Sequence, residues 1–368
     1  MESLIEISDL FIEYPLSTRF IATLMGKPQR KVHAVNGVSL GIPRGSILSL
    51  VGESGSGKTT MGKAVVRLHD PRHVRGSVRF EGAEVTSLSG EKLLDYRRKV
   101  QMIFQDPYQS LNPRHPIHKI LTEPLRVHRL CGSEEEYRER AARALEEVGL
   151  VPTENYLDRF PHELSGGQRQ RIAIAGALVL EPELIVADEP VSMLDVSIRS
   201  DLLRLMLKTR ENHTLTYLFI THDISLAWVL SDFIAIMYLG TVVETGSADQ
   251  IVHSPLHPYT QALIEIMPRL VPRKGIPRRI LGGEVPNPVD FPKGCPFQNR
   301  CPERRPECAE ERPRLRAPRA GSAGLDAAGK AGLDASGGPP ADEGAAPAAE
   351  GGTSPGPVVD RLVACHFR

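Results

Sequence analysis

A glycine-rich segment near residue 52 has the residue types and the spacing of a phosphate-binding loop. The run Gly52-Glu53-Ser54-Gly55-Ser56-Gly57-Lys58-Thr59 satisfies the pattern G-x-x-x-x-G-K-[ST]. Glycine permits the backbone conformations that turn successive N–H groups towards an anion, and the helix that follows presents its positive end there. Lys58 would reach the β- and γ-phosphates of a nucleotide, and Thr59 would coordinate Mg²⁺. Because an apolar run precedes this loop and a predicted helix follows it, we interpret it as a nucleotide site and not as an inert turn.

Two acidic residues follow a second apolar run and could hold a metal ion and a water molecule. Residues 184–187 are all apolar and predict a buried strand, and Asp188 and Glu189 appear where that strand ends. In an open parallel sheet the carboxyl ends of the strands face the ligand. Asp188 would hold Mg²⁺, directly or through water, and Glu189 would polarise the water that attacks a phosphate. Most Asp-Glu pairs are solvated surface residues, so this interpretation depends on the apolar run before the pair.

A third run, residues 164–171, lies between these two elements and opens a predicted helix. Its sequence, Leu-Ser-Gly-Gly-Gln-Arg-Gln-Arg, resembles the signature motif of the ABC ATPases, which phosphate-loop NTPases in general lack. Together the matching motifs cover about residues 4–250. Four further positions resemble that family: the adenine-stacking aromatic residue at Tyr14, the Q-loop at Gln105, the D-loop at Asp195 and the switch histidine at His222.

The resemblance implies an α/β fold of the phosphate-loop (P-loop) NTPase type. An ABC nucleotide-binding domain has a RecA-like parallel-sheet core, an antiparallel β subdomain and a helical subdomain that contains the signature. Two such domains face head to tail, so that each ATP lies between the phosphate loop of one chain and the signature of the other. This arrangement is physically reasonable because the signature N–H groups lie at a helix N-terminus, where a γ-phosphate binds favourably.

The site residues that the resemblance implies fall into three groups. Glu189 is predicted to be the catalytic carboxylate, with His222 acting at the γ-phosphate and Gln105 linking the metal site to the membrane partner. Thr59, Gln105 and Asp188 are predicted to hold Mg²⁺. The residues predicted to bind ATP are Tyr14, Gly52, Ser54, Gly55, Ser56, Gly57, Lys58, Thr59, Thr60, Ser165, Gly166, Gly167, Gln168 and Asp195.

Four less generic stretches are similar to the ATP-binding subunits of oligopeptide and dipeptide permeases. They are residues 110–114 (Ser-Leu-Asn-Pro-Arg), 188–192 (Asp-Glu-Pro-Val-Ser), 253–260 (His-Ser-Pro-Leu-His-Pro-Tyr-Thr) and 294–297 (Gly-Cys-Pro-Phe). This resemblance implies a motor that drives peptide import through two separate transmembrane permease subunits. It also implies a second ATPase subunit, identical or a paralogue, an indirect link to a solute-binding protein, and a peripheral position on the cytoplasmic face of the inner (plasma) membrane. Importers of nickel and other small solutes share this subfamily, and the motor does not touch the solute, so that alternative stays open.

A soluble ABC ATPase of DNA repair or translation is the competing hypothesis. Such repair proteins carry a long coiled-coil insertion and such translation factors usually carry two cassettes, whereas this sequence has one phosphate loop, one signature and no sustained heptads. A catalytically inactive scaffold would need the loss of Lys58, Glu189 or His222, and all three are present. The sequence departs from the family at Gly176, where relatives usually have Arg, and at Met193, where a small residue is common.

Hydrophobic periodicity predicts the elements that position these residues. Ser133 and Glu136 form a capping-box pattern at the start of an amphipathic helix that Gly149 ends, and Pro43-Arg44-Gly45 is a turn signal between two strands. Strands that alternate with helices favour a mostly parallel sheet. We expect strands at 4–14, in two pieces over 34–50, at 184–187 and at 217–220, and helices at 61–68, 133–149 and 198–210.

The overall composition excludes some classes of function. Lys plus Arg and Asp plus Glu both number 45, so the net charge gives no reason to expect a nucleic-acid partner. No apolar run approaches the roughly 18–20 residues that span a bilayer. The first six residues lack the basic start and apolar stretch of a secretory signal, and we therefore expect a cytoplasmic location.

After about residue 268 proline becomes frequent and the sequence changes character. Residues 317–357 consist mostly of Gly, Ala, Pro, Asp and Ser, with almost no large apolar side chains, and this composition predicts a disordered low-complexity insert. We therefore divide the chain into a nucleotide-binding domain at 1–268, a cysteine-containing C-terminal extension at 269–316 with 358–368, and the insert at 317–357.

Four of the five cysteines lie in that extension and predict one inorganic centre. Cys295, Cys301 and Cys308 follow the spacing C-x5-C-x6-C, and Cys365 follows the insert. Zinc sites usually contain tighter C-x2–4-C pairs, whereas this wider spacing suits a bulkier cluster whose iron corners lie farther apart. The resemblance to peptide-permease ATPases with such a tail adds the expectation of a [4Fe–4S] cluster; zinc and four reduced thiols are the alternatives. Cys131 is not expected to be a ligand.

Overall fold

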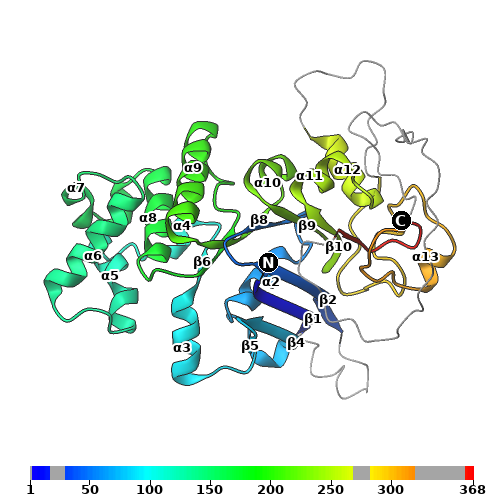
Figure 1. Cartoon of the computed structure of the whole chain (residues 1–368), viewed down its shortest axis with the longest axis horizontal. Helices are drawn as coiled ribbons and strands as arrows, with labels where there is room; N and C mark the ends of the chain where they lie inside the picture. Colours follow the sequence, from blue (N-terminus) through cyan, green and yellow to red (C-terminus); the bar gives the residue numbers. More distant parts are fainter. Residues whose placement is uncertain (1, 17–29, 268–281, 320–360) are drawn as a thin grey trace, which may run out of the picture.

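The computed structural model describes residues 2–16, 30–267, 282–319 and 361–368, which form two β-sheets flanked by helices (Figure 1). The antiparallel sheet has the order β2-β1-β4-β5, and the larger sheet has the order β11-β10-β9-β3-β8-β7-β6. Strands β3, β6, β7, β8 and β9 of the larger sheet are parallel, and β10 and β11 complete it in antiparallel pairs. The strands are β1 (Ser3–Pro15), β2 (Lys31–Pro43), β3 (Ile47–Val51), β4 (Val74–Phe80), β5 (Ala83–Glu84), β6 (Val100–Ile103), β7 (Leu184–Asp188), β8 (Thr216–Thr221), β9 (Phe233–Tyr238), β10 (Thr241–Ser247) and β11 (Leu362–Val363).

The helices divide into groups along the long axis of the molecule. Helices α5 to α8 gather at one end, and α11, α12 and the described residues of 282–319 and 361–368 lie towards the other (Figure 1). The helices are α2 (Lys58–Val65), α3 (Gly90–Lys99), α4 (Pro107–Ser110), α5 (Ile117–Val127), α6 (Glu134–Glu147), α7 (Glu154–Leu157), α8 (Gly166–Leu178), α9 (Val196–His213), α10 (Ile224–Leu230), α11 (Ala248–His253), α12 (Pro258–Ile266) and α13 (Glu307–Glu310), with 3₁₀ turns at Pro71–His73 and Pro161–Glu163.

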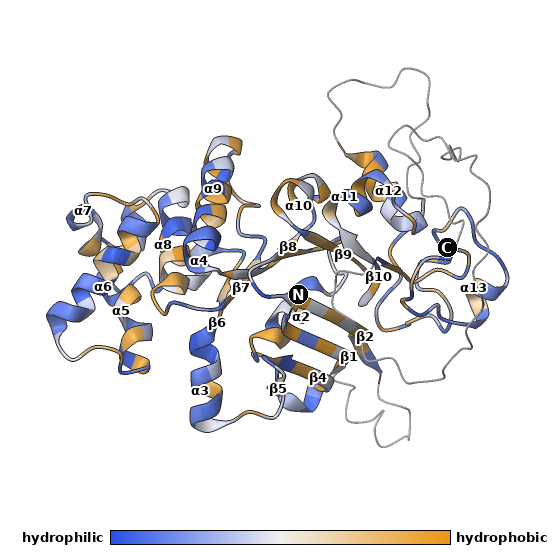
Figure 2. Ribbon diagram, in the orientation of Figure 1, coloured by the Kyte–Doolittle hydropathy of each residue, from blue (hydrophilic) through white to orange (hydrophobic). Residues whose placement is uncertain are grey.

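The parallel strands are buried on both faces, which explains their nearly continuous apolar sequences. In β7, Leu184 and Val186 join the core that lies against the antiparallel sheet, whereas Ile185 and Ala187 join the core beneath α5, α6 and α8. Strand β8 repeats this alternation, as its backbone requires. Hydrophobic residues run along β8 and β9, while α3 is almost wholly hydrophilic (Figure 2). The sheet is therefore a rigid platform for the residues that follow its strands.

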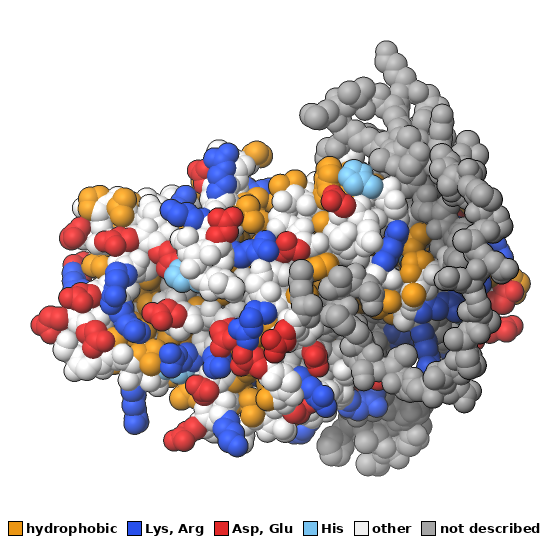
Figure 3. All heavy atoms as spheres, in the orientation of Figure 1, with side chains coloured by type: hydrophobic (Ala, Val, Ile, Leu, Met, Phe, Trp, Pro, Cys, Tyr) orange, Lys and Arg blue, Asp and Glu red, His pale blue; other side chains and the backbone are white. Residues whose placement is uncertain are grey.

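The predicted elements are present, with shifts at their ends. The predicted helix at 61–68 begins earlier, at Lys58, and ends at Val65, because the phosphate loop leads directly into it. In α6 the Ser133 hydroxyl accepts from the Glu136 backbone N–H at 3.2 Å. The Glu136 carboxylate accepts from Gly132 and not from Ser133, so the predicted capping box is displaced by one residue. Acidic and basic side chains are interspersed over the face shown in Figure 3, in keeping with the balanced composition.

The C-terminal residues pack beside β9 and β10. Cys295, Phe297 and Cys308 belong to a buried apolar cluster with Tyr238 of β9 and Tyr259 of α12. Strand β11 pairs with β10, and an isolated bridge joins Arg316 to Val363. The residues after 319 and before 361 lie outside the described residues, and so does most of the predicted insert.

Candidate functional site

The phosphate loop connects β3 to α2, and two of its glycines occupy positions that larger residues could not. Gly57 has a φ of +99°, and a Cβ there would meet the Ala34 carbonyl oxygen at 2.3 Å. A Cβ on Gly52 would meet the Met237 carbonyl oxygen at 2.1 Å. The close approach of β2 and β9 therefore requires glycine at both ends of the loop. This packing leaves the N-terminus of α2 facing the space where an anion would bind.

Lys58 lies almost fully buried inside the loop. Its Nζ donates to the Gly52 carbonyl at 2.8 Å and to the Glu53 carbonyl at 2.9 Å. Burial lowers the pKa of Lys58, and the nearby carboxylates of Glu189, Asp188 and Glu53 oppose that shift. The loop therefore holds the Lys58 ammonium group in place. The same group is predicted to contact the phosphates of a nucleotide that binds there.

Thr59 and Asp188, two of the predicted magnesium ligands, are joined by a hydrogen bond. The Thr59 hydroxyl donates to Asp188 Oδ1 at 3.0 Å, which joins the start of α2 to the end of β7. Burial raises the pKa of Asp188, and the hydrogen bond from Thr59 acts in the opposite direction. A hydroxyl and a carboxylate at one sheet edge supply the oxygen ligands that Mg²⁺ prefers.

The three predicted catalytic side chains converge, although they come from different strand ends. Gln105 Nε2 donates to Glu189 Oε2 at 3.0 Å, and His222 Nδ1 lies 3.2 Å from Glu189 Oε1. Glu189 has a φ of +46°, which is uncommon for a residue with a side chain, and its N–H donates to the Ile220 carbonyl at 2.9 Å. The carboxylate is therefore fixed at the mouth of the phosphate loop by contacts on both sides.

These residues line a cavity of about 690 Å³. Its wall includes Ser54, Gly55, Gly57, Lys58, Thr59 and Thr60 of the loop region, together with Gln105, Glu189 and His222. Asp188 lies beside it through Thr59. Four further lining residues had no motif to indicate them: Val32, Ala34, Leu263 and Pro288.

Tyr14 is not among the residues that line this cavity. Its hydroxyl forms a hydrogen bond of 2.9 Å with His69 Nδ1, and its ring lies 5.4 Å from the His73 ring. Strand β1 ends at Pro15, and the ring packs against the turn after α2 instead. Adenine stacking on Tyr14 remains a prediction.

The signature residues form the N-terminus of α8, away from the cavity of their own chain. The Ser165 hydroxyl accepts from the Gln168 N–H at 3.3 Å, and Gln168 Oε1 accepts from the Ser165 N–H at 3.0 Å. Gly166 and Gly167 open the helix, and a Cβ on Gly167 would meet Ile198 at 2.8 Å. Asp195 caps the next helix, α9, without a side-chain hydrogen bond to it. Neither Ser165 nor Asp195 is among the lining residues of the chain's own cavity.

The departure at Gly176 lies in α8, and a Cβ there would approach only Leu121, at 3.9 Å. A side chain would therefore fit on the backbone at this position. Gly176 is not among the residues that line the nucleotide cavity.

The four cysteines of the extension line one small cavity of about 20 Å³, together with His257 and Phe297. Burial raises the pKa of Cys295 to about 12 and that of Cys301 to about 11, so these thiols are protonated at neutral pH unless a metal displaces the proton. Among the described residues, however, no three His, Cys, Asp or Glu side chains are arranged to hold a metal ion. Cys131 packs elsewhere, against the helical core.

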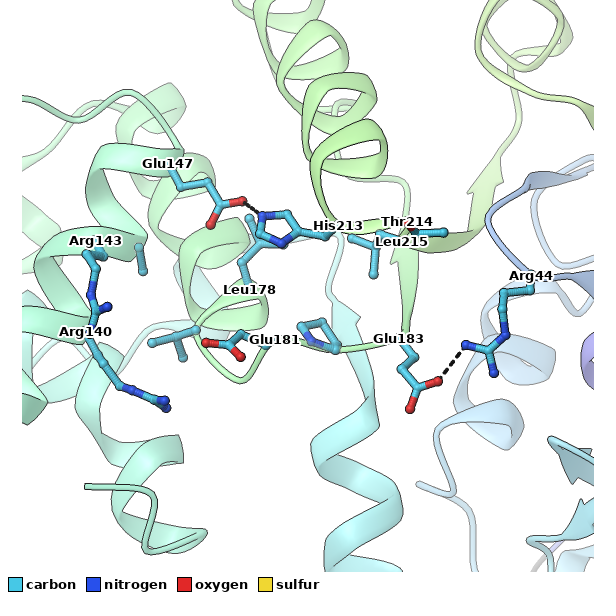
Figure 4. Close-up of a pocket in the computed structure, with 13 residues that line it drawn as sticks. Arg44, Arg140, Arg143, Glu147, Leu178, Glu181, Glu183, His213, Thr214 and Leu215 are labelled. Atoms are coloured by element: carbon cyan, nitrogen blue, oxygen red, sulfur yellow. Dashed lines mark hydrogen bonds and ion pairs between the residues drawn. The ribbon is translucent and has the colours of Figure 1, made fainter. Parts of the chain in front are cut away.

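A second cavity, of about 420 Å³, lies at the N-terminal ends of β7 and β8, and none of the predicted site residues lines it (Figure 4). Its charged side chains include two ion pairs, Arg44 with Glu183 and His213 with Glu147. These pairs connect α6 and β2 to the residues around β7 and α9.

Comparison with known proteins gives consistent matches. The family model described as ABC transporter matches residues 35–192, and that described as oligopeptide/dipeptide transporter, C-terminal region, matches residues 243–308. The chain is 43% identical to the oligopeptide transport ATP-binding protein AppF of Bacillus subtilis over 86% of this chain and 94% of that one. It is 42% identical to the dipeptide transport ATP-binding protein DppF of Escherichia coli over 86% and 91% of the two chains.

Solved structures agree with the fold. A dimeric post-hydrolysis state of the ATP-binding cassette MJ0796, bound to ADP and Pi, superposes with a TM-score of 0.57 at 29% identity and covers 66% of this chain and 98% of that one. Another dimeric structure of MJ0796, described as a bacterial ABC transporter cassette, gives the same values. Within the part of the chain that the structure describes, no helix is both long and apolar enough to cross a bilayer.

Proposed function

This chain belongs to the ABC transporter ATP-binding proteins of the oligopeptide and dipeptide transport family, and we propose that it hydrolyses ATP to drive the import of short peptides. One observation carries the catalytic part: Glu189 is held between Gln105 and His222 at the mouth of the phosphate-loop cavity. The match of residues 243–308 to the transporter C-terminal region supports the peptide part.

In the proposed mechanism the triphosphate binds along the loop and the N-terminus of α2, where Lys58 contacts its β- and γ-phosphates. Glu189 orients a water molecule and accepts its proton while the water oxygen bonds to the γ-phosphorus. The bond from that phosphorus to the β,γ-bridging oxygen breaks, and ADP leaves. His222 and Gln105 hold the Glu189 carboxylate in line through the contacts of 3.2 and 3.0 Å. Thr59, Gln105 and Asp188 would hold Mg²⁺, whose positive charge would offset the negative charge of the phosphates.

We propose a head-to-tail dimer with a second ABC ATPase, identical or a paralogue. The signature N-cap at Ser165 lies outside the cavity of its own chain. Because the Ser165 and Gln168 N–H groups are used within the capping box, the N–H groups of Gly166 and Gly167 would contact a γ-phosphate bound by a neighbour. The remaining proposed partners are two transmembrane permease subunits and, indirectly, a solute-binding protein. The chain would then lie on the cytoplasmic face of the plasma membrane, with residues 1–268 as the motor, 269–316 and 358–368 as the extension, and 317–357 as the insert.

We also propose that Cys295, Cys301, Cys308 and Cys365 hold one inorganic centre, a [4Fe–4S] cluster rather than zinc. Convergence of all four thiols on one cavity supports a shared ligand. Among the described residues no compact ligand group is present, so the proposal rests on the four thiols that line one cavity and on the resemblance to peptide-permease ATPases with such a tail. Such a centre would stabilise the extension, since ATP hydrolysis needs no electron transfer.

The cluster proposal is tested by purifying the whole chain without oxygen. We expect a brown protein with broad absorbance near ~400 nm and about four irons per chain, and the Cys301→Ser variant should lose both. A Cys131→Ser variant is the matched control and should keep them. Colourless protein with stoichiometric zinc, or with no metal, would overturn this proposal and leave the ATPase assignment intact.

The transport proposal is tested with a strain that lacks this chain. Uptake of a labelled dipeptide or oligopeptide should fall, return with the wild-type chain, and stay low with Glu189→Gln. Loss of nickel uptake with normal peptide uptake would instead show the same motor serving a different solute. Normal uptake of both solutes, with the chain absent from purified membrane complexes, would favour a soluble ABC ATPase.

A further inference from the structure

Arg300 of the C-terminal extension contacts the phosphate loop. Arg300 Nη1 donates to both carboxylate oxygens of Glu53, at 2.9 and 3.2 Å, and Glu53 is the second residue of the loop. The Arg300 side chain is only 7% exposed. Its Nε donates to the Gly282 carbonyl at 3.3 Å, and its guanidinium lies 5.8 Å from the centre of the Tyr238 ring. These contacts hold the Arg300 guanidinium in one orientation against the loop.

The backbone of Glu53 is held from the same side. Its N–H donates to the Tyr259 hydroxyl at 3.0 Å. Tyr259 is fully buried among aromatic rings, 4.8 Å from Tyr238 and 5.4 Å from Phe297. Phe297 belongs to the extension, three residues before Arg300 in the same segment. Side chain and main chain of Glu53 thus both depend on residues far beyond the loop in sequence.

Glu53 in turn supports the residue that is predicted to contact phosphate. Lys58 Nζ donates to the Glu53 carbonyl at 2.9 Å, so a displacement of Glu53 would displace one of the acceptors that hold the ammonium group. The extension also forms part of the cavity wall through Pro288. The Pro288 carbonyl accepts a hydrogen bond from the His33 N–H of β2 at 3.0 Å. The extension is therefore continuous with the nucleotide site at two points.

We propose that Arg300 is a positioning residue for nucleotide binding, which keeps the phosphate loop in its anion-binding conformation through Glu53. A partly buried ion pair with two hydrogen bonds can hold a loop in one conformation. Removal of one partner leaves the other charged and poorly solvated. The role rests on ATP binding at this cavity and does not depend on which solute is transported.

The test measures ATP binding and steady-state hydrolysis in the full-length chain. Arg300→Ala should raise the Kd and the KM for ATP about 10-fold, the scale expected for a lost charged hydrogen bond, while kcat at saturating ATP changes less than about 3-fold. Arg300→Lys keeps the charge and one donor and should recover most of the affinity. Arg304→Ala removes an exposed arginine of the same extension and should bind ATP as the wild type does.

A second variant changes Glu53, the other member of the Arg300–Glu53 ion pair. It is needed in case Arg300→Ala loosens the extension as a whole. Glu53→Gln should weaken ATP binding to a similar degree, and the double variant should be no weaker than the worse single variant, since both remove one interaction. Wild-type Kd values for both Arg300→Ala and Glu53→Gln, or fully additive losses in the double variant, would overturn the positioning role. If only peptide uptake failed, the Kd values of the variants relative to the wild type would be unchanged. That result would bear only on the proposed solute.

Discussion

The nucleotide cavity and the cysteine pocket both gather several reactive side chains around a small space, but they hold them differently. At the cavity, Gln105, Glu189 and His222 each follow a strand of the same parallel sheet, so regular backbone pairing brings them together. At the pocket, Cys308 comes from the short helix α13, and Cys365 follows a two-residue strand, β11. Side-chain packing around Phe297, and not a continuous sheet, holds the pocket together.

This difference predicts which property, activity or stability, a substitution in each region changes first. The sheet beneath the cavity should survive the loss of one predicted catalytic side chain, so substitutions there should change chemistry and leave folding intact. The described residues of the extension have little regular structure, and their stability should rest on a few large buried side chains. Substitutions in the pocket should therefore change stability first. The following predictions separate these two behaviours.

The largest effect is expected at Glu189. The Glu189→Gln variant should lower kcat by about 10²–10⁴-fold, because an amide cannot accept the proton of the attacking water. ATP binding should persist, since Lys58 and the loop are unchanged, and thermal unfolding should match the wild type. Single-turnover hydrolysis and nucleotide binding are the measurements. Lys58→Ala is the matched contrast and should weaken binding itself; hydrolysis by Glu189→Gln at the wild-type rate would show that another group is the base.

In the extension, Phe297→Ala should lower the free energy of unfolding by about 3–5 kcal/mol, the cost of a large cavity in an aromatic cluster. Phe297 is 1% exposed and contacts Tyr238, Tyr259 and His257. Phe291→Ala, at a partly buried phenylalanine of the same extension, should cost clearly less. Denaturant unfolding with limited proteolysis measures both variants, and equal losses would contradict a specific role for the Phe297 cluster.

The same contrast explains which features the sequence could predict. Motifs predicted the loop, Asp188, Glu189, Gln105 and His222, because the function depends on local backbone conformation and on strand ends that share one edge. Sequence reasoning missed Pro288, Leu263 and Arg300, which reach the site through tertiary packing that no local pattern records. The same limit applies to Tyr14, whose place at a strand end could be inferred but whose contact with His69 could not.

Alanine substitutions at two glycines of the phosphate loop should have smaller effects on stability, and these effects can be compared with each other. Gly57→Ala should destabilise the fold by about 2–3 kcal/mol, because its φ of +99° is strained for alanine and its Cβ would meet the Ala34 carbonyl oxygen at 2.3 Å. Gly55 also has a positive φ, +78°, but a Cβ there meets nothing within 4 Å. Gly55→Ala should therefore cost only about 1 kcal/mol. Unfolding curves without nucleotide test the difference, and a reversed order would contradict the packing described for β2.

The smallest effect is expected from removal of the insert. Deletion of residues 320–356 should leave ATP hydrolysis unchanged, because that composition contributes few apolar side chains to any core. The two sides of the insert meet in the structure: the Arg316 N–H donates to the Val363 carbonyl at 3.2 Å, and the Val363 N–H donates to the Arg316 carbonyl at 2.8 Å. A much shorter connection can therefore join them without moving β11.

Loop-closure entropy gives the sign of any change that the deletion causes. A shorter loop loses less entropy when its ends meet, so the deletion should raise the free energy of unfolding by about 1 kcal/mol or leave it unchanged. Replacement of the deleted residues by a glycine-serine segment of equal length is the matched control, and it should behave as the wild type does. A large fall in melting temperature for the deletion and for the replacement alike would show that these residues hold the cysteine pocket together, and the proposed division between extension and insert would then be wrong.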